Sequence, residues 1–96
     1  MKMVFIMFGE AINSEVFDIL KQHSIHHYTK WTRVLGAGNA SGPHLSSHIW
    51  PKGNNVLALA VEDNIAPALL ESIRRLRAEH GSEGVKAFTL PIEEMT

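Results

Sequence analysis

The stretch of sequence most indicative of the fold is Tyr28–Trp50, YTKWTRVLGAGNASGPHLSSHIW. Its first residues are rich in aromatic and β-branched side chains, which fit the pleated surface of a β-strand. The stretch then becomes rich in Gly, Ser and His before a second strand-like run begins after residue 53. A loop of this length is uncommon in a small domain unless it is disordered or binds something. We therefore expect function at the loop, residues 36–53.

Three further segments predict strands. Met3–Phe8 is an unbroken apolar run, and Val56–Val61 is apolar on both alternating faces, as expected of buried strands. Val85–Ile92 predicts the last strand, and Pro91 within it suits the edge of a sheet because proline has no amide hydrogen to donate. The two strands that are apolar on both sides are expected at the centre of the sheet.

Helical patterns separate these strands. Residues 13–15, Asn-Ser-Glu, have the chemistry of a helix N-cap, and apolar residues then recur at helical spacing. A second helix is expected to begin at Asp63 or Asn64, with Pro67 in its first turn, and to end at Gly81. The order βαββαβ predicts an α+β fold of the ferredoxin-like type, a four-stranded antiparallel sheet with two helices on one face.

Two helices can cover only one face of such a sheet. Either Leu57, Leu59 and Val61, or the alternate set of Val56–Val61, would then lie on the uncovered face, together with alternate residues of the first strand. An exposed apolar surface of this extent usually marks an interface. We therefore expect the sheet faces to be buried in a homo-oligomer.

Length and composition fit a single domain over residues 1–96. Hydrophobic residues make up 45% of the chain, and the formal charge of -1 gives no general attraction to nucleic acid. Cysteine is absent, which excludes disulfides and thiol chemistry. No apolar stretch approaches the roughly 20 residues of a membrane helix. A cytoplasmic protein without membrane insertion is expected.

The predicted strand before the long loop ends in a Gly-x-Gly pattern at Gly36 and Gly38. Such glycines let backbone amides approach a phosphate or carboxylate without a side-chain clash, although a flexible hinge explains the pattern equally well. Lys30, Arg33 and Lys52 flank the loop and could draw an anion towards it. The pattern is neither a P-loop nor a dinucleotide fingerprint.

His44 and His48 have a spacing that would place both imidazoles on one side of a helical turn. With a third ligand from elsewhere they could hold zinc or copper, but local hydrogen bonding or ligand contact is the more frequent role of loop histidines. The sequence has no Gly-x-Ser-x-Gly or His-Glu-x-x-His motif, and the loop has no pair of carboxylates. An enzyme is not expected.

The residues Thr32–Gly38, TRVLGAG, followed by a long loop and a second strand, resemble the PII nitrogen-regulatory superfamily. Gly81–Phe88, GSEGVKAF, is similar to the second ligand-contacting loop and last core strand of that family. The similarity of layout spans nearly the whole chain. It implies a homotrimer with its sheets packed around a central axis. It also implies ligand clefts between subunits, each bordered by the base of the long loop from one subunit and the Gly81–Lys86 loop from another.

The resemblance implies a signalling protein that binds a nucleotide or another small anion and regulates a partner, such as a transporter or an enzyme, through the long loop. The residues it implies in ligand binding are Gly36, Gly38, Asn39, Ser41, Gly84 and Lys86. The residues it implies in contact with the partner are Gly42, His44, His48 and Trp50.

The sequence also departs from the nucleotide-binding members of that family. Asn39 stands where they have a basic residue after Gly-x-Gly, and the loop lacks the tyrosine that some members modify. The CutA-type divalent-cation tolerance proteins share the fold and the trimeric state, which gives an alternative function. In that alternative the chain forms a metal-binding trimer through His44 and His48. The candidate ligands are a nucleotide, another anion and a divalent metal, and the sequence does not decide between them. It also does not identify the partner.

Overall fold

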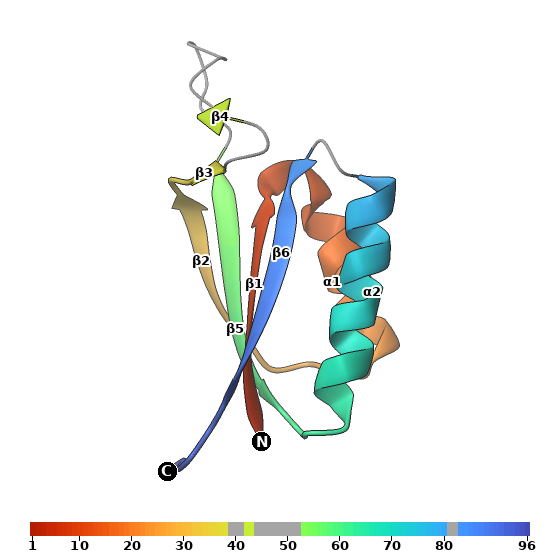
Figure 1. Cartoon of the computed structure of the whole chain (residues 1–96), viewed down its shortest axis with the longest axis vertical. Helices are drawn as coiled ribbons and strands as arrows, with labels where there is room; N and C mark the ends of the chain where they lie inside the picture. The colour runs from red at the N-terminus through yellow and green to blue at the C-terminus, as the bar shows by residue number, and fades with distance from the viewer. Residues whose placement is uncertain (39–41, 44–52, 81–82) are drawn as a thin grey trace.

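The structure is a computed structural model that describes residues 1–38, 42–43, 53–80 and 83–96. Its elements in chain order are β1 (Lys2–Gly9), the short helix η1 (Glu10–Ile12), α1 (Asn13–Gln22), β2 (Thr29–Val34), β3 (Ala37–Gly38), β4 (Gly42–Pro43), β5 (Asn54–Val61), α2 (Ile65–Glu79) and β6 (Val85–Pro91). Figure 1 shows the four long strands as one layer, with both α-helices packed on one side of it.

The four long strands form an antiparallel sheet in the order β2-β5-β1-β6. The central strands are β1 and β5, the two that the apolar runs predicted, and they pair from Lys2 opposite Val61 to Gly9 opposite Asn54. β6, which contains Pro91, lies at an edge as expected. The predicted α+β fold of the ferredoxin-like type is therefore confirmed.

The hydrophobic core lies between the sheet and the two helices. Alternate residues of β1 and β5 are buried on the helix side, and each helix buries the apolar residues of one face. Burying one such side chain stabilises the fold by about 1.5–3 kcal/mol, which fixes the face that each helix turns to the sheet. The largest fully buried side chains are Phe8, Ile6, Ile12, Leu20, Leu57, Leu69, Val4 and Val16.

The helix starts differ in part from the prediction. Asn13 was expected to cap the first helix, but η1 precedes α1 and Asn13 lies inside the helical segment. Its Oδ1 atom instead accepts hydrogen bonds from Lys30 and Asn55. In α2, Asn64 is the N-cap residue without a side-chain cap bond, and Pro67 lies in the first turn as predicted. Of the helices in the described part of the chain, none has the length and apolar character needed to cross a membrane.

The face of the sheet opposite the helices is not covered by any described element (Figure 1). The strand register places one alternating set of residues of each strand on this face. We call its apolar members the open-face patch: Met3, Phe5, Met7, Trp31, Val56, Ala58, Ala60, Phe88 and Leu90. Within it, Met7, Trp31, Phe88 and Leu90 each keep between 42% and 48% of their surface exposed. Of the two sets considered for β5, the one left open is therefore that of Val56.

Part of the long loop has regular structure that the sequence did not predict. β3 pairs antiparallel with β4, with Ala37 opposite Pro43 and Gly38 opposite Gly42. This small ladder lies beyond the end of the main sheet, where β2 ends and β5 begins (Figure 1). The base of the loop is thus organised on both sides of residues 39–41.

Candidate functional site

The predicted ligand-binding segments lie at one end of the sheet, which we call the loop end (Figure 1). Gly36 precedes β3, Gly38 lies in β3 and Gly42 lies in β4. Gly84 immediately precedes β6, and Lys86 lies within that strand. The remaining predicted site residues lie outside the described residues; they are Asn39, Ser41, His44, His48 and Trp50.

Two backbone hydrogen bonds attach both candidate loops to the end of β1. The amide of Gly9 donates to the carbonyl oxygen of Gly84 at 3.2 Å, and the amide of Glu10 donates to the carbonyl oxygen of Gly53 at 3.1 Å. Gly53 is the described residue at the C-terminal side of the long loop. Because Gly9 and Glu10 are adjacent, the two loop bases lie side by side within one chain.

The backbone is closely packed at the base of the long loop. A Cβ atom on Gly53 would lie 2.6 Å from Oε1 of Glu10 and 3.3 Å from Cα of Arg33. A Cβ atom on Gly36 would lie 2.8 Å from Nδ2 of Asn54. Real Cβ atoms essentially never approach other atoms within 3.0 Å, so a side chain at Gly53 or Gly36 would displace the end of the Glu10 or Asn54 side chain. In both cases the atom in the way is the end of a side chain, so Glu10 and Asn54 reach into the space that these glycines leave.

At the second loop, Gly84 has a φ of 69°. This is the left-handed region of backbone conformation, which glycine adopts at low cost and other residues do not. A Cβ atom at Gly84 would meet no heavy atom within 4 Å. The backbone at this turn is therefore accessible, as a segment that contacts a ligand through its amides requires.

Arg33 has an unusual backbone conformation where β2 reaches the loop end. Its φ is 55°, and a left-handed conformation costs a non-glycine residue on the order of 1–3 kcal/mol. The register between β2 and β5 also shifts between Trp31 and Val34, which indicates a β-bulge. Strained residues and bulges are frequent at functional sites. The sequence identified Arg33 as a flanking cation but gave no sign of the bulge.

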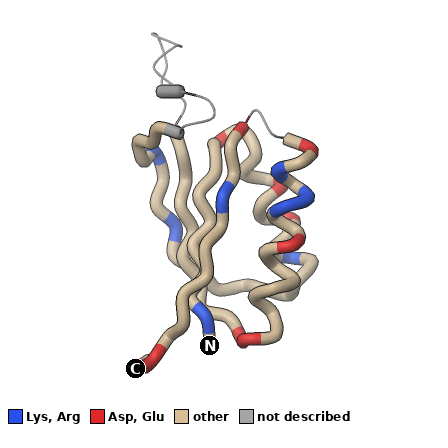
Figure 2. The backbone as a smooth tube through the Cα atoms, in the orientation of Figure 1, with Lys and Arg blue, Asp and Glu red and all other residues tan. Residues whose placement is uncertain are grey.

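The Arg33 side chain is largely in solvent, with 85% of its surface exposed, and its Nε atom lies 3.8 Å from Oε1 of Glu10. Acidic and basic positions thus meet at the loop end, whereas the strands between the two ends carry few charges (Figure 2). Glu10 begins η1, directly after β1. The structure places it between the long loop and the end of β1.

Lys30 does not take the position expected of it. It pairs with Leu57 of β5 and therefore faces the helices, and its Nζ atom donates to Oδ1 of Asn13 at 2.8 Å. The same Nζ lies 5.0 Å from the ring centroid of Phe17, within the range of a cation–π contact. The expectation that Lys30 draws an anion towards the loop is not supported by this placement. Lys52 lies outside the described residues.

Lys86, by contrast, lies on the open face of the sheet. It stands opposite Met7 of β1, and its Nζ atom is 5.8 Å from the ring centroid of Phe88. The side chain is exposed and starts two residues after Gly84. Lys86 therefore supplies positive charge at the edge strand, next to the second loop.

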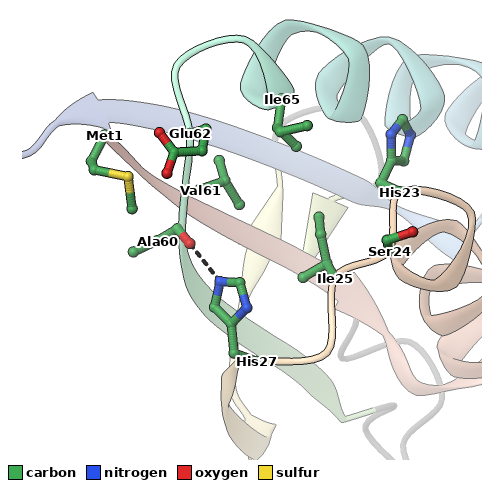
Figure 3. Close-up of a pocket in the computed structure, with 9 residues that line it drawn as sticks. All are labelled: Met1, His23, Ser24, Ile25, His27, Ala60, Val61, Glu62 and Ile65. Carbon is green, nitrogen blue, oxygen red and sulfur yellow. Dashed lines mark hydrogen bonds between the residues drawn. The ribbon is translucent and has the colours of Figure 1, made fainter.

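The histidines near the end of α1 lie at the opposite end of the sheet, around a cavity of about 250 Å³ (Figure 3). His27 Nε2 donates to the carbonyl oxygen of Ala60 at 2.6 Å, and His23 Nε2 shares a hydrogen bond with Oγ of Ser72 at 2.9 Å. Both imidazoles are thus held by local hydrogen bonds. Within the described residues, no three His, Cys, Asp or Glu side chains are arranged to hold a metal ion.

No protein-family model matches the chain, and no curated protein matches it in sequence. Solved structures match it over most of its length. CPII from Thiomonas intermedia K12, bound to ADP, AMP and acetate, superposes with a TM-score of 0.71 at 18% identity, covering 97% of this chain and 88% of that chain. The apo form of CPII, a nitrogen regulatory PII-like protein, gives a TM-score of 0.66 at 19% identity, covering 93% and 87%.

A second protein gives the same result. A protein from Thermus thermophilus, described as a putative PII-like signaling protein, superposes with a TM-score of 0.66 at 19% identity, covering 93% of this chain and 82% of that chain. Similarity of this kind establishes a shared fold. The resemblance that the sequence showed around Gly36 and Gly84 is confirmed at that level: this chain has the fold of the PII-like proteins.

Proposed function

We propose that this protein is a PII-like signalling protein, a homotrimer that binds a small anionic ligand between subunits and regulates a partner protein through its long loop. The observation that carries the proposal is the attachment of both candidate loops to adjacent residues, through the hydrogen bonds of Gly9 and Glu10. A ligand that contacts one loop base therefore also affects the position of the other.

The groups available at the loop end suit an anion. Gly84 leaves the backbone open to close approach, and Arg33 and Lys86 supply exposed positive charge. CPII, which shares the fold, has been solved with ADP, AMP and bicarbonate. Adenine nucleotides and bicarbonate are therefore the first ligands to test. In this proposal Gly38, Asn39 and Ser41 complete the binding site.

The open-face patch supports self-association. It extends across all four strands of the sheet, and apolar surfaces of this kind usually belong to an interface. In the proposed trimer the open faces of three subunits pack around a central axis. The ligand cleft then lies where the loop end of one subunit meets its neighbour.

The long loop is proposed to contact the partner, a transporter or an enzyme in the cytoplasm, through residues that include Gly42, His44, His48 and Trp50. A ligand needs to favour one loop conformation by only a few kcal/mol to act as a switch. Binding and regulation, rather than catalysis, are proposed. The metal-binding alternative through His44 and His48 stays a prediction.

Thermal unfolding with added ligands tests the proposal, with the mass in solution recorded in parallel. The panel contains ADP, AMP, ATP, cyclic nucleotides, bicarbonate, 2-oxoglutarate, zinc and copper. A ligand at a hundredfold its Kd stabilises the folded state by about 2.7 kcal/mol, a shift that is easily measured. We expect a nucleotide or bicarbonate to stabilise a trimer.

Matched variants then localise the site. Lys86→Met is expected to reduce the stabilisation by the anion, whereas Lys2→Met, a change at the far end of the sheet, is expected to leave it unchanged. Stabilisation by metals alone, lost in a His44→Ala/His48→Ala variant, would favour the metal-binding alternative. A monomer that no member of the panel stabilises would contradict both functions.

A further inference from the structure

We propose that Arg33 binds the anionic group of the ligand, a phosphate or a carboxylate, and that Glu10 positions Arg33 in the free protein and competes with the ligand for it. The inference rests on the proposed function, because it requires a ligand at the loop end. It assigns a binding role to a residue outside the Gly-x-Gly pattern, and a competing role to a carboxylate of η1.

The path of β2 sets the direction of the Arg33 side chain. Trp31 stands opposite Val56 on the open face, and Lys30 stands opposite Leu57 on the helix face. A regular strand would continue this alternation and turn Arg33 to the same face as Trp31. The bulge places both Thr32 and Arg33 against a single residue of β5. The left-handed backbone at Arg33 thus redirects its side chain towards Glu10.

Glu10 is held in place at the base of the long loop. Its amide donates to the carbonyl oxygen of Gly53. Its Oε1 atom lies 2.6 Å from the position that a Cβ atom on Gly53 would occupy. The Cα atom of Arg33 is 3.3 Å from the same position. The carboxylate of Glu10 and the backbone of Arg33 therefore share the space that glycine leaves. The Glu10 carboxylate therefore lies close to the backbone of Arg33.

The guanidinium of Arg33 retains capacity for a stronger partner. It carries five N–H donors, and its ion-pair partner in the described part of the chain is Glu10, at 3.8 Å from Nε. An exposed pair at this distance is weak. A phosphate or carboxylate that accepts two parallel hydrogen bonds from the guanidinium makes a stronger contact. The ligand is therefore able to displace Glu10 from Arg33.

The charges around this pair agree with a competition. Glu83 lies next to Gly84 in the second loop, and Lys86 lies in β6 on the open face. Lys30 is bound to Asn13 on the other face of the sheet. Arg33 is thus the exposed cation that the described residues of β2 present at the loop end. Glu10 and Glu83 provide the negative charge that an entering anion meets.

The competition predicts effects of opposite sign. Removing the charge of Arg33 removes its contact with the bound ligand, so the affinity for the ligand falls. Removing the charge of Glu10 removes both a competitor and a source of repulsion, so affinity rises. If the pair served only to hold the loop base, each change would disturb the site and both would lower affinity.

The experiment is calorimetric titration of the wild-type protein and three variants with ADP and, separately, with sodium bicarbonate. Arg33→Gln is expected to weaken binding about tenfold, and Glu10→Gln to strengthen it about threefold. Arg74→Gln is the control, because Arg74 forms a comparable exposed pair with Glu71 at 3.0 Å on α2, and it is expected to bind as the wild type does. Thermal unfolding without ligand verifies that each variant is folded.

The two ligands identify the group that Arg33 contacts. A loss confined to ADP assigns the contact to phosphate, and a loss confined to bicarbonate assigns it to the carboxylate-like anion. If the wild-type protein binds but Arg33→Gln binds equally well, or if both charge variants weaken binding, this inference is wrong and the proposed function stands. If the wild-type protein binds neither of these ligands nor any other anion of the thermal panel, the proposed function is wrong and the inference falls with it.

Discussion

Phe5 and Phe88 stand directly opposite each other on β1 and β6, on the face of the sheet that neither helix covers. Ala58 of β5 continues the same row on the other side of Phe5, and Phe88 keeps 42% of its surface exposed. Exposure of such an apolar row to water is unfavourable, and its burial against another subunit lowers the free energy. It is the physical basis for expecting an oligomer.

Replacing Phe88 with Glu should therefore dissociate the protein. A carboxylate is costly to bury in an apolar interface. We expect the mass measured by light scattering at micromolar concentration to fall from the oligomer to the monomer. Met95→Glu is the control, because Met95 is also exposed but lies after β6. A Phe88→Glu protein with the mass of the wild-type oligomer would contradict this use of the open-face patch.

The hydrogen bonds of Asn13 predict a loss of stability. Its Oδ1 atom accepts from Lys30 at 2.8 Å and from Nδ2 of Asn55 at 3.2 Å, and Asn55 is buried. Asn13→Ala leaves both donors without this acceptor, which is expected to lower the free energy of unfolding by about 1–3 kcal/mol. Asn13→Asp retains an acceptor in place and should cost less. Urea unfolding of the two variants measures the difference, and equal losses would show that these hydrogen bonds do not matter.

Backbone conformation predicts two substitutions of opposite effect. Gly84→Ala meets no steric obstacle, so its cost comes from the φ of 69° and should be about 1–2 kcal/mol. Ser24, which follows α1, has a φ of 56°, and Ser24→Gly should stabilise the protein by up to about 1 kcal/mol because glycine adopts this conformation more easily. Urea unfolding gives both values. A neutral Gly84→Ala would indicate that this turn changes conformation.

The sequence predicted the sheet because the apolar runs at Met3–Phe8 and Val56–Val61 are properties of local composition. The helices cover one alternating set of each central strand, and the other set belongs to the open-face patch. The first helix start was predicted less well. Asn13 has the chemistry of a cap, but its side chain is used in contacts with Lys30 and Asn55, which are distant in sequence.

The candidate site was predicted only in outline. Gly36 and Gly84 were identified from short motifs, and both lie at the loop end. The bulge at Arg33 and the contact of Glu10 with Gly53 were not predicted, because they depend on how residues far apart in the chain meet. The one local signal was a glycine at position 53 next to a strand start, which is typical of close backbone approach but does not identify the neighbour.

The most direct test of the central claim is calorimetric titration of ADP into the purified protein, with the mass of the same sample measured. We expect saturable binding to a trimer, with one equivalent site per subunit and loss of affinity in Arg33→Gln. The absence of binding by ADP, AMP and bicarbonate to folded protein would contradict the proposed function. Binding of zinc or copper in the same sample, lost in the His44→Ala/His48→Ala variant, would then assign these loop histidines to a metal site.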